Sequence, residues 1–311
     1  MSAPSSRASK TTPSPDVNRL LTEGTLEVVG RLTDASNVTL LGRLQLNGES
    51  LHCIYKPIRG ERPLWDFPDG TLAYREVAAY LVSEAAGWHC VPTTVLRSGP
   101  LGDGMVQEWI GPTPDLSDAD DPDDFDEPDE FDDTGAGEGS AGESDAGAAA
   151  TIAAADLVAL LPASQVPAGW LPVFRALDTD GTVLAVCHAD DPRLELIAGF
   201  DLVVNNADRK APHLLTAADQ RILGVDHGIA FHVEDKLRTI LWGWAGGPLP
   251  DAVVDGFDRL QHWLDAADNP LDELLTIAEL RRLRQRIGRY LRYPVFPQPP
   301  KDRTPIPWPP L

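Results

Sequence analysis

A long acidic stretch divides this chain of 311 residues into two parts that are able to fold. Residues 115–145 hold 15 Asp and Glu side chains and no Lys or Arg. The wider stretch 112–150 consists mainly of Asp, Glu, Gly, Ala and Ser, which bury too little apolar area to offset the entropy lost on ordering. We therefore predict a disordered acidic insertion at 112–150, with a folded part on either side of it.

The charge of the remaining chain restricts the classes of partner. The formal net charge is −22, and subtracting the 15 acidic residues of the insertion leaves −7 for the rest. Such a value is ordinary for a soluble domain and argues against a broad basic surface for nucleic acid. The longest apolar runs, such as 157–161, are far shorter than the roughly 18 residues that a membrane-spanning helix needs.

Both ends of the chain differ in composition from a globular domain. Residues 1–16 are rich in Ser, Pro and Thr and lack the apolar stretch of a secretory signal, so we predict a disordered lead-in at 1–23 and a cytoplasmic location. Residues 294–311 contain 8 prolines. This composition predicts an extended tail, which either packs on the folded part or is exposed as a polyproline ligand for a partner protein.

Hydrophobic periodicity predicts an α+β architecture. In the first part, 24–111, alternation of apolar residues followed by helical spacing predicts strands at 25–32, 38–46 and 51–56, a helix at 71–86, and a hairpin of strands at 92–96 and 105–110. In the second part, 151–293, the same reasoning predicts helices around 156–161, 193–205, 252–266 and 271–291. We expect a small sheet-rich part and a mostly helical part.

Two charged residues of the first part suit phosphate chemistry. Lys56 is one of five lysines in the chain and ends a largely apolar predicted strand. A cation in this place can bind the phosphates of a nucleotide, although an edge strand also carries lysine simply to prevent aggregation. Glu76 lies on the following predicted helix, from which it can pair with Lys56; the alternative is an ordinary surface glutamate.

Two aspartates of the second part complete the set that phosphoryl transfer requires. Asp208 stands in the string Asn206-Ala-Asp208-Arg209, and Asp226 begins the string Asp226-His-Gly228-Ile-Ala-Phe231. The two strings flank a predicted short hairpin, so their aspartates can converge on one metal and phosphate site. Asp208 would be ionised at neutral pH and able to accept a hydroxyl proton, whereas Asp226 would bind Mg²⁺.

These strings, together with Tyr55-Lys56-Pro57, resemble the motifs of the phosphatidylinositol 3-/4-kinase family, in particular the type II phosphatidylinositol 4-kinases. Their order and separation also suit an actinobacterial kinase-like branch. The resemblance covers 38–231 without the insertion. It implies an atypical, lipid-kinase-like form of the two-lobed protein-kinase fold, with an N-lobe at 24–111 and a catalytic C-lobe at 151–293. ATP and Mg²⁺ would bind between the lobes, and a lipid, protein or small-molecule hydroxyl would accept the γ-phosphoryl group.

The resemblance also implies a role for each site residue. Lys56 would contact the ATP phosphates, Glu76 would brace Lys56, and Asp208 would be catalytic, with Arg209 beside it. The residues that contact adenine would be Gln107, Glu108, Trp109 and Ile110. No Gly-x-Gly-x-x-Gly loop is present, so the turn at 33–37, with Ser36 and Asn37, would hold the phosphates.

One position departs from the family pattern. Five residues after the catalytic aspartate, where the family has a metal-binding Asn, this chain has His213. Imidazole binds divalent metals but favours ions softer than Mg²⁺. Either His213 is a metal ligand beside Asp226, or Asn205 or Asn206 takes the place of the missing Asn.

Two further functions fit the same residues. A pseudokinase would bind nucleotide and regulate a partner without catalysis. A metal-dependent hydrolase would use the aspartates with His213, His227 and His232.

Trp242 and Trp244 either line a substrate pocket or belong to the core. A set of arginines on the last helix could contact acidic lipid head groups or form a solvated helix face: Arg281, Arg282, Arg284, Arg286 and Arg289.

Overall fold

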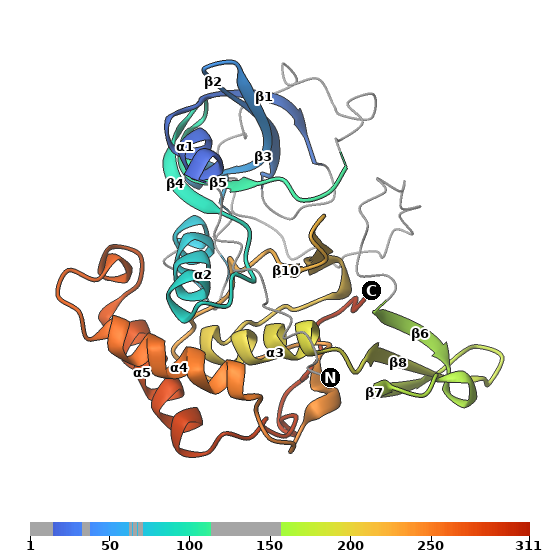
Figure 1. Ribbon diagram of the computed structural model, residues 1–311. Coiled ribbons are helices and arrows are strands. Elements are labelled where there is room, and N and C mark those ends of the chain that lie inside the picture. Colours follow the sequence, from blue (N-terminus) through green and yellow to red (C-terminus); the bar gives the residue numbers. More distant parts are fainter. Residues whose placement is uncertain (1–14, 33–37, 62–63, 65–66, 68–70, 113–156) are drawn as a thin grey trace, which may run out of the picture.

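A computed structural model describes residues 15–32, 38–61, 64, 67, 71–112 and 157–311 of the protein. Within these residues the chain is α+β, with antiparallel sheets and five α-helices (Figure 1). The predicted α+β class is therefore confirmed. The five-stranded sheet lies at one end and most helices at the other, an arrangement compatible with two lobes. The predicted insertion, Pro112 apart, and the turn at 33–37 with Ser36 and Asn37 lie outside the described residues.

The N-terminal sheet has the strand order β1-β2-β3-β5-β4, and each pair is antiparallel. Its strands are β1 (Thr25–Arg31), β2 (Leu40–Leu46), β3 (Glu49–Pro57), β4 (Thr94–Gly99) and β5 (Gly102–Glu108). All five predicted strands of this part are present, with ends that shift by a few residues. Lys56 lies on β3, the central strand, opposite Met105 of β5. The interpretation of Lys56 as an edge-strand charge is therefore wrong.

Helix α1 (Pro15–Glu23) packs on this sheet, so the prediction of a disordered lead-in at 1–23 is wrong from residue 15 onward. Leu20 and Leu21 are buried, and Leu21 belongs to the apolar cluster of the sheet. Arg97 of β4 donates from Nη1 to the backbone oxygens of Leu21 and Gly24, which satisfies carbonyls at the end of the helix. Contact with the sheet supplies the apolar burial that a polar, nine-residue segment cannot achieve alone.

Helix α2 (Leu72–Ala86) lies between the sheet and the helices of the second part (Figure 1). Its first turn is capped at a distance, because the Glu61 carboxylate accepts hydrogen bonds from the backbone N–H groups of Leu72 and Ala73. Gly87 ends the helix in the left-handed conformation, as the sequence predicts. Glu76 is therefore carried by a rigid element that faces both parts of the molecule.

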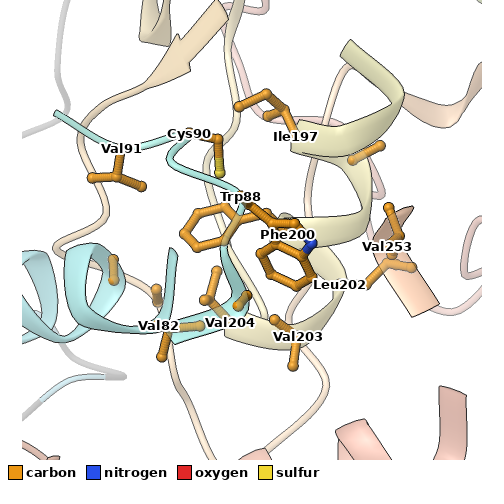
Figure 2. Close-up of a cluster of buried hydrophobic side chains, with 14 of the residues drawn as sticks. Val82, Trp88, Cys90, Val91, Ile197, Phe200, Leu202, Val203, Val204 and Val253 are labelled. Atoms are coloured by element: carbon orange, nitrogen blue, oxygen red, sulfur yellow. The ribbon is translucent and has the colours of Figure 1, made fainter. Parts of the chain in front are cut away.

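The second part is built around α3 (Pro192–Val204), α4 (Asp251–Leu264) and α5 (Ile277–Arg292). Figure 2 shows part of the core between α2, α3 and α4, where the rings of Trp88 and Phe200 meet edge to face with their centroids 6.1 Å apart. Helix α5 begins six residues later than predicted, because Thr276 and Glu279 form a reciprocal capping box that defines its first turn. The segment before it forms a short 3-10 turn, Pro270–Glu273.

A second sheet was not predicted. Its strands are β6 (Val158–Pro162), β7 (Trp170–Leu177) and β8 (Val183–Ala189), in the order β6-β8-β7. The helix predicted at 156–161 is therefore wrong in the described residues. An apolar run of this length suits a buried strand as well as a helix, and pairing of Leu160 with Val186 in β8 decides for the strand. The second part is thus less helical than expected.

The proline-rich tail packs on the folded part. Pro294, Phe296, Pro305 and Pro310 each accept a backbone hydrogen bond from the body. Of the two predicted states of this tail, the packed one is confirmed and the free polyproline ligand is wrong for these residues. No helix within the described residues has both the length and the apolar character to cross a membrane.

Several arginines of α5 have structural partners. Arg286 is buried and donates to the carbonyl of Val203. Arg282 and Arg284 donate to the carbonyls of Val233 and Leu264. Arg281 and Arg289 are exposed. The five arginines therefore do not form one free basic face.

Candidate functional site

Lys56, Glu76 and Asp226 come together at the end of the central strand. Lys56 lies on β3, Glu76 on α2, and Asp226 follows β10 (Ile222–Gly224). Nζ of Lys56 lies 2.8 Å from Oε1 of Glu76 and 2.9 Å from Oδ1 of Asp226. One lysine thus joins two carboxylates from distant parts of the chain, as the motifs predict.

Charge and burial together fix the ionisation of this cluster. Burial alone would lower the pKa of Lys56, but the attraction of Asp226 and Glu76 outweighs it, so the pKa is raised and the ammonium is charged. Lys56 in turn holds the pKa of Asp226 far below its usual range. Because 49% of the Asp226 side chain is exposed, its ionised carboxylate is open to a ligand from solution.

Glu76 is a buried connector between two parts of the chain. Only 1% of its side chain is exposed, so the interpretation of Glu76 as a surface glutamate is wrong. Its Oε1 accepts a hydrogen bond from the ammonium of Lys56, and its Oε2 accepts one from the backbone N–H of His227 at 2.8 Å. Asp226 itself has a φ of 61°. The hydrogen bond to the next peptide group supports this strained backbone.

Asp208 lies beside a cation that the sequence analysis did not single out. Its Oδ2 is 3.2 Å from Nζ of Lys210, and its backbone N–H donates to Oδ1 of Asn206 at 3.0 Å. Burial raises the pKa of Asp208, against the attraction of Lys210 and His213. The signal for Lys210 was present in the sequence, as another of the five lysines, two residues after the aspartate.

His213 faces both aspartates. Its Nδ1 lies 2.7 Å from the backbone oxygen of Asp208, and its Nε2 lies 3.5 Å from Oδ2 of Asp226. Since a carbonyl only accepts, Nδ1 carries the proton. Burial lowers the pKa of His213, so at neutral pH the ring is neutral and Nε2 presents a lone pair to the carboxylate. Nε2 of His213 and Oδ2 of Asp226 are thus two acceptor atoms that face each other, an arrangement in which both can bind one cation.

The two asparagines considered as substitutes are used elsewhere. An asparagine binds a metal through Oδ1, but Oδ1 of Asn205 accepts the backbone N–H of Lys236 at 2.9 Å, and Oδ1 of Asn206 accepts that of Asp208 at 3.0 Å. Both side chains are buried. The alternative in which either replaces the missing metal-binding Asn is therefore wrong, and His213 is the residue that faces Asp226.

Arg209 does not reach the site, although it was expected to be catalytic beside Asp208. It is fully buried, and its guanidinium donates to both carboxylate oxygens of Asp201 at 2.9 and 3.0 Å. It also donates to the carbonyls of His213 and Val225. A side chain enclosed in this way cannot touch a substrate. Arg209 instead ties the loop of Asp208 to the strand that leads to Asp226, which is a positioning role.

A cavity of about 410 Å³ opens beside this cluster. Lys56 and Asp226 line it together with the four residues predicted to contact adenine: Gln107, Glu108, Trp109 and Ile110. The side chain of Gln107 is buried and donates to Oγ1 of Thr94, which holds the strand end in place. Apolar walls come from Ile54 on one side and Leu215 on the other. The cavity thus lies between the sheet and the second part.

Comparison with known proteins places the chain in a family. No family model matches the sequence. The chain is 44% identical over 298 residues to Protein Rv2133c of Mycobacterium tuberculosis (strain ATCC 25618 / H37Rv), a match that covers 94% of this chain and 95% of that protein. The chain belongs to the family of Protein Rv2133c. Since the match spans nearly the whole of both chains, it includes both folded parts of this Rv2133c-family member.

In this Rv2133c-family chain the histidines do not gather around one metal. His227 is fully buried, and its Nε2 accepts a hydrogen bond from Arg209. The ring of His232 packs edge to face on Phe67 at 5.1 Å. Among the residues that the structure describes, no group of three or more His, Cys, Asp or Glu side chains could hold a metal ion. His213 is thus the one of these three histidines that faces an aspartate of the site in the described residues.

Sequence reasoning missed Asp201 in this Rv2133c-family chain. The residue is fully buried in α3, and it neutralises Arg209 eight positions later. A single acidic residue within the apolar run of α3 was the available signal.

The two tryptophans have structural places. Trp242 belongs to the main core, as one of the two interpretations had it, and Trp244 packs against that core.

Proposed function

We propose that this protein is an ATP-dependent phosphotransferase with a two-lobed, kinase-like fold, which transfers the γ-phosphoryl group of ATP to a hydroxyl. The observation that carries the proposal is the contact of Lys56 with both Glu76 and Asp226 on the wall of the 410 Å³ cavity. Phosphoryl transfer needs a cation on the phosphates, a carboxylate for the metal and another near the hydroxyl. Lys56, Asp226 and Asp208 supply these three groups.

The cavity suits the nucleotide. Its volume falls within the usual range for small-molecule sites, and its apolar walls fit a purine ring. Residues 107–110 lie at its border, where backbone groups can bind the edge of the base. Lys56 would donate to phosphate oxygens at the opposite end, with Glu76 keeping its ammonium in position.

Asp208 is proposed to accept the proton of the attacking hydroxyl. Its raised pKa makes the carboxylate a better base, and it remains partly open to solvent. Lys210, 3.2 Å away, provides a positive charge next to the position of the reacting phosphoryl group. Loops that vary freely on a shared fold choose the acceptor, so lipid, protein and small-molecule hydroxyls are all compatible with these groups.

A divalent ion fits between Asp226 and His213. Oδ2 of Asp226 and Nε2 of His213 would hold it, because both atoms are acceptors that face each other at 3.5 Å. When bound, such an ion neutralises charge on the phosphoryl oxygens. Since imidazole favours softer ions than Mg²⁺, Mn²⁺ is a second candidate metal.

A panel of nucleotides and metals tests the proposal by thermal unfolding. ATP with Mg²⁺ or Mn²⁺ should raise the melting temperature of the full chain, because a ligand that binds only the folded state stabilises it. Asp208→Asn should keep this shift and abolish ATP turnover. The absence of any shift with all nucleotides would contradict the nucleotide site, and unchanged turnover in Asp208→Asn would contradict the role of Asp208.

A nucleotide-binding pseudokinase is the second candidate. The observation that favours it is His213, which stands where the resembling family has a metal-binding Asn, while Asn205 and Asn206 are engaged in buried hydrogen bonds. Such a protein should show the thermal shift with ATP but no turnover with either metal. Replacing His213 by Asn separates the two candidates further, since restored turnover with Mg²⁺ would identify the histidine as the cause.

A further inference from the structure

The loop that carries Asp208 is the first of three adjacent layers of chain. The second layer is the segment 238–240, which runs beside it: Arg209 donates its backbone N–H to the oxygen of Arg238 at 3.0 Å, and Ile240 donates to the oxygen of Arg209 at 3.1 Å. These two bonds hold the loop at the residue after Asp208. They leave the segment that follows, with Lys210 and Ala211, to be fixed by other contacts.

The third layer is the end of the proline-rich tail. The oxygen of Pro305 accepts the backbone N–H of Thr239 at 3.1 Å and Nε1 of Trp242 at 2.9 Å. Five residues later, the oxygen of Pro310 accepts the backbone N–H of Ala211 at 2.9 Å. The tail thus contacts both the second layer and the loop itself. We call residues 305–310 the tail strap.

The tail strap is anchored rather than merely adjacent. Ile306 packs against the main core, and Pro307 and Pro310 are buried. Upstream, Phe296 is buried and exchanges backbone hydrogen bonds with Gly246 and Gly247. Proline restricts the backbone of the strap before it binds, so little entropy is lost in holding it against the loop.

The contact at Ala211 lies close to the proposed chemistry. Ala211 is the residue after Lys210, whose ammonium pairs with Asp208, and it begins the 3-10 turn Ala211–His213 that presents His213 to Asp226. A shift of the Ala211 peptide group would therefore displace Lys210 and His213 together. Displacements of about 1 Å are enough to lower catalytic rates substantially.

We propose that the tail strap positions the loop of Asp208, Lys210 and His213 through the hydrogen bond from Ala211 to Pro310. The effect on turnover rests on the proposed phosphotransferase function, whereas the effect on the loop does not. The strap does not touch the substrate. It acts on the chemical step by holding the loop, and it leaves nucleotide binding at Lys56 and residues 107–110 unchanged.

Two truncations that differ by one residue test this role. Deletion of 310–311 removes the acceptor of the Ala211 N–H, whereas deletion of Leu311 alone, which is 43% exposed, keeps Pro310 in place. Hydrogen exchange measured by mass spectrometry should become faster in 208–213 by about fivefold or more in the longer deletion only, the factor expected for one lost hydrogen bond. Exchange in α4 should remain as in the full chain. In the same variant kcat should fall about tenfold while the affinity for ATP is retained.

Each outcome decides the proposal. Equal exchange of 208–213 in the two truncations would overturn it, and so would acceleration of α3 and α4 by the same factor, because that result would indicate general destabilisation. Faster exchange in 208–213 with an unchanged kcat would overturn the positioning role. If the full chain turns over no ATP, the phosphotransferase proposal fails, and the exchange comparison still decides whether the strap holds the loop.

Discussion

Arg75 of α2 and Glu279 of α5 form a buried ion pair that links the helix of Glu76 to the C-terminal part of the chain. The same arginine donates from Nη1 to the backbone oxygen of Ala230 at 2.7 Å, four residues after Asp226. Arg75 and its neighbour Glu76 therefore hold the loop after Asp226 at two points, since Glu76 accepts the N–H of His227. The position of α2, and with it the Lys56 contact, depends on this link.

Removing Glu279 should destabilise the protein strongly. Glu279→Ala leaves the Arg75 guanidinium buried without its counter-charge and also breaks the capping box with Thr276, so we expect a loss of about 3–5 kcal/mol. Denaturant unfolding measures the change. Glu23→Ala is a suitable control, because its ion pair with Arg19 is more than half exposed and should contribute less than about 1 kcal/mol. Equal effects of the two substitutions would contradict the buried pair.

Loss of Lys56 should strongly weaken nucleotide binding. In Lys56→Ala the thermal shift produced by ATP should fall by at least two-thirds, since the phosphates lose their cation and Asp226 and Glu76 lose their shared partner. Differential scanning fluorimetry with and without ATP measures the shift. Lys301→Ala, at an exposed position of the tail, should behave like the parent protein. A full ATP shift in Lys56→Ala would exclude the lysine from the nucleotide site.

Stability should fall as the pH drops below about 6.5. Burial lowers the pKa values of His188, His213 and His227, so these rings stay neutral in the folded state while they take up protons in the unfolded state. The stability that the neutral rings contribute is present above the pKa that histidine has in the unfolded chain, and it is lost as the pH falls below that value. Below about pH 4 the depressed pKa of Asp226 adds a loss of the same sign.

Urea unfolding at pH 7.5, 6.5 and 5.5 measures this dependence. Each histidine protonated only in the unfolded state adds up to about 1.4 kcal/mol per pH unit to the slope. His188→Gln should reduce the slope by up to that amount. His262→Gln, at a side chain that is 77% exposed, is the matched control and should keep the parent slope. The same slope in His188→Gln as in the parent protein would contradict a buried, neutral His188.

Two glycines in helices should respond to alanine in opposite directions. A Cβ at Gly256 of α4 would lie 2.2 Å from Nε1 of Trp88, whose ring is fixed between Phe200 and Phe257. We expect Gly256→Ala to cost about 1–3 kcal/mol. At Gly288 of α5 nothing lies within 4 Å of an added Cβ, so Gly288→Ala should stabilise by about 0.5–1 kcal/mol. Stabilisation by both substitutions would mean that α4 and Trp88 are not in close contact.

Local patterns predicted the elements whose partners lie nearby. Alternating residues identified the five strands of the first sheet, and Gly87 marked the end of α2. The prediction of a helix over the short apolar run at 157–161 was wrong. A run of this length fits a strand or a helix, and only pairing with β8 distinguishes the two. The prediction of disorder at 15–23, where α1 lies, was wrong for a related reason, since the apolar side of α1 is buried by the sheet on which it packs.

The order of amino acids specifies which chemical groups are present and where they occur along the chain: a strand with Lys56, a helix with Glu76, and two loops with Asp208 and Asp226. The use of each charge depends on how these elements pack. Arg209 follows Asp208 directly, yet it is enclosed by Asp201 and two carbonyl groups, whereas Lys210 remains beside the aspartate. The reason is physical. A charged side chain is catalytic or structural according to the groups that surround it, and those groups come from distant parts of the chain.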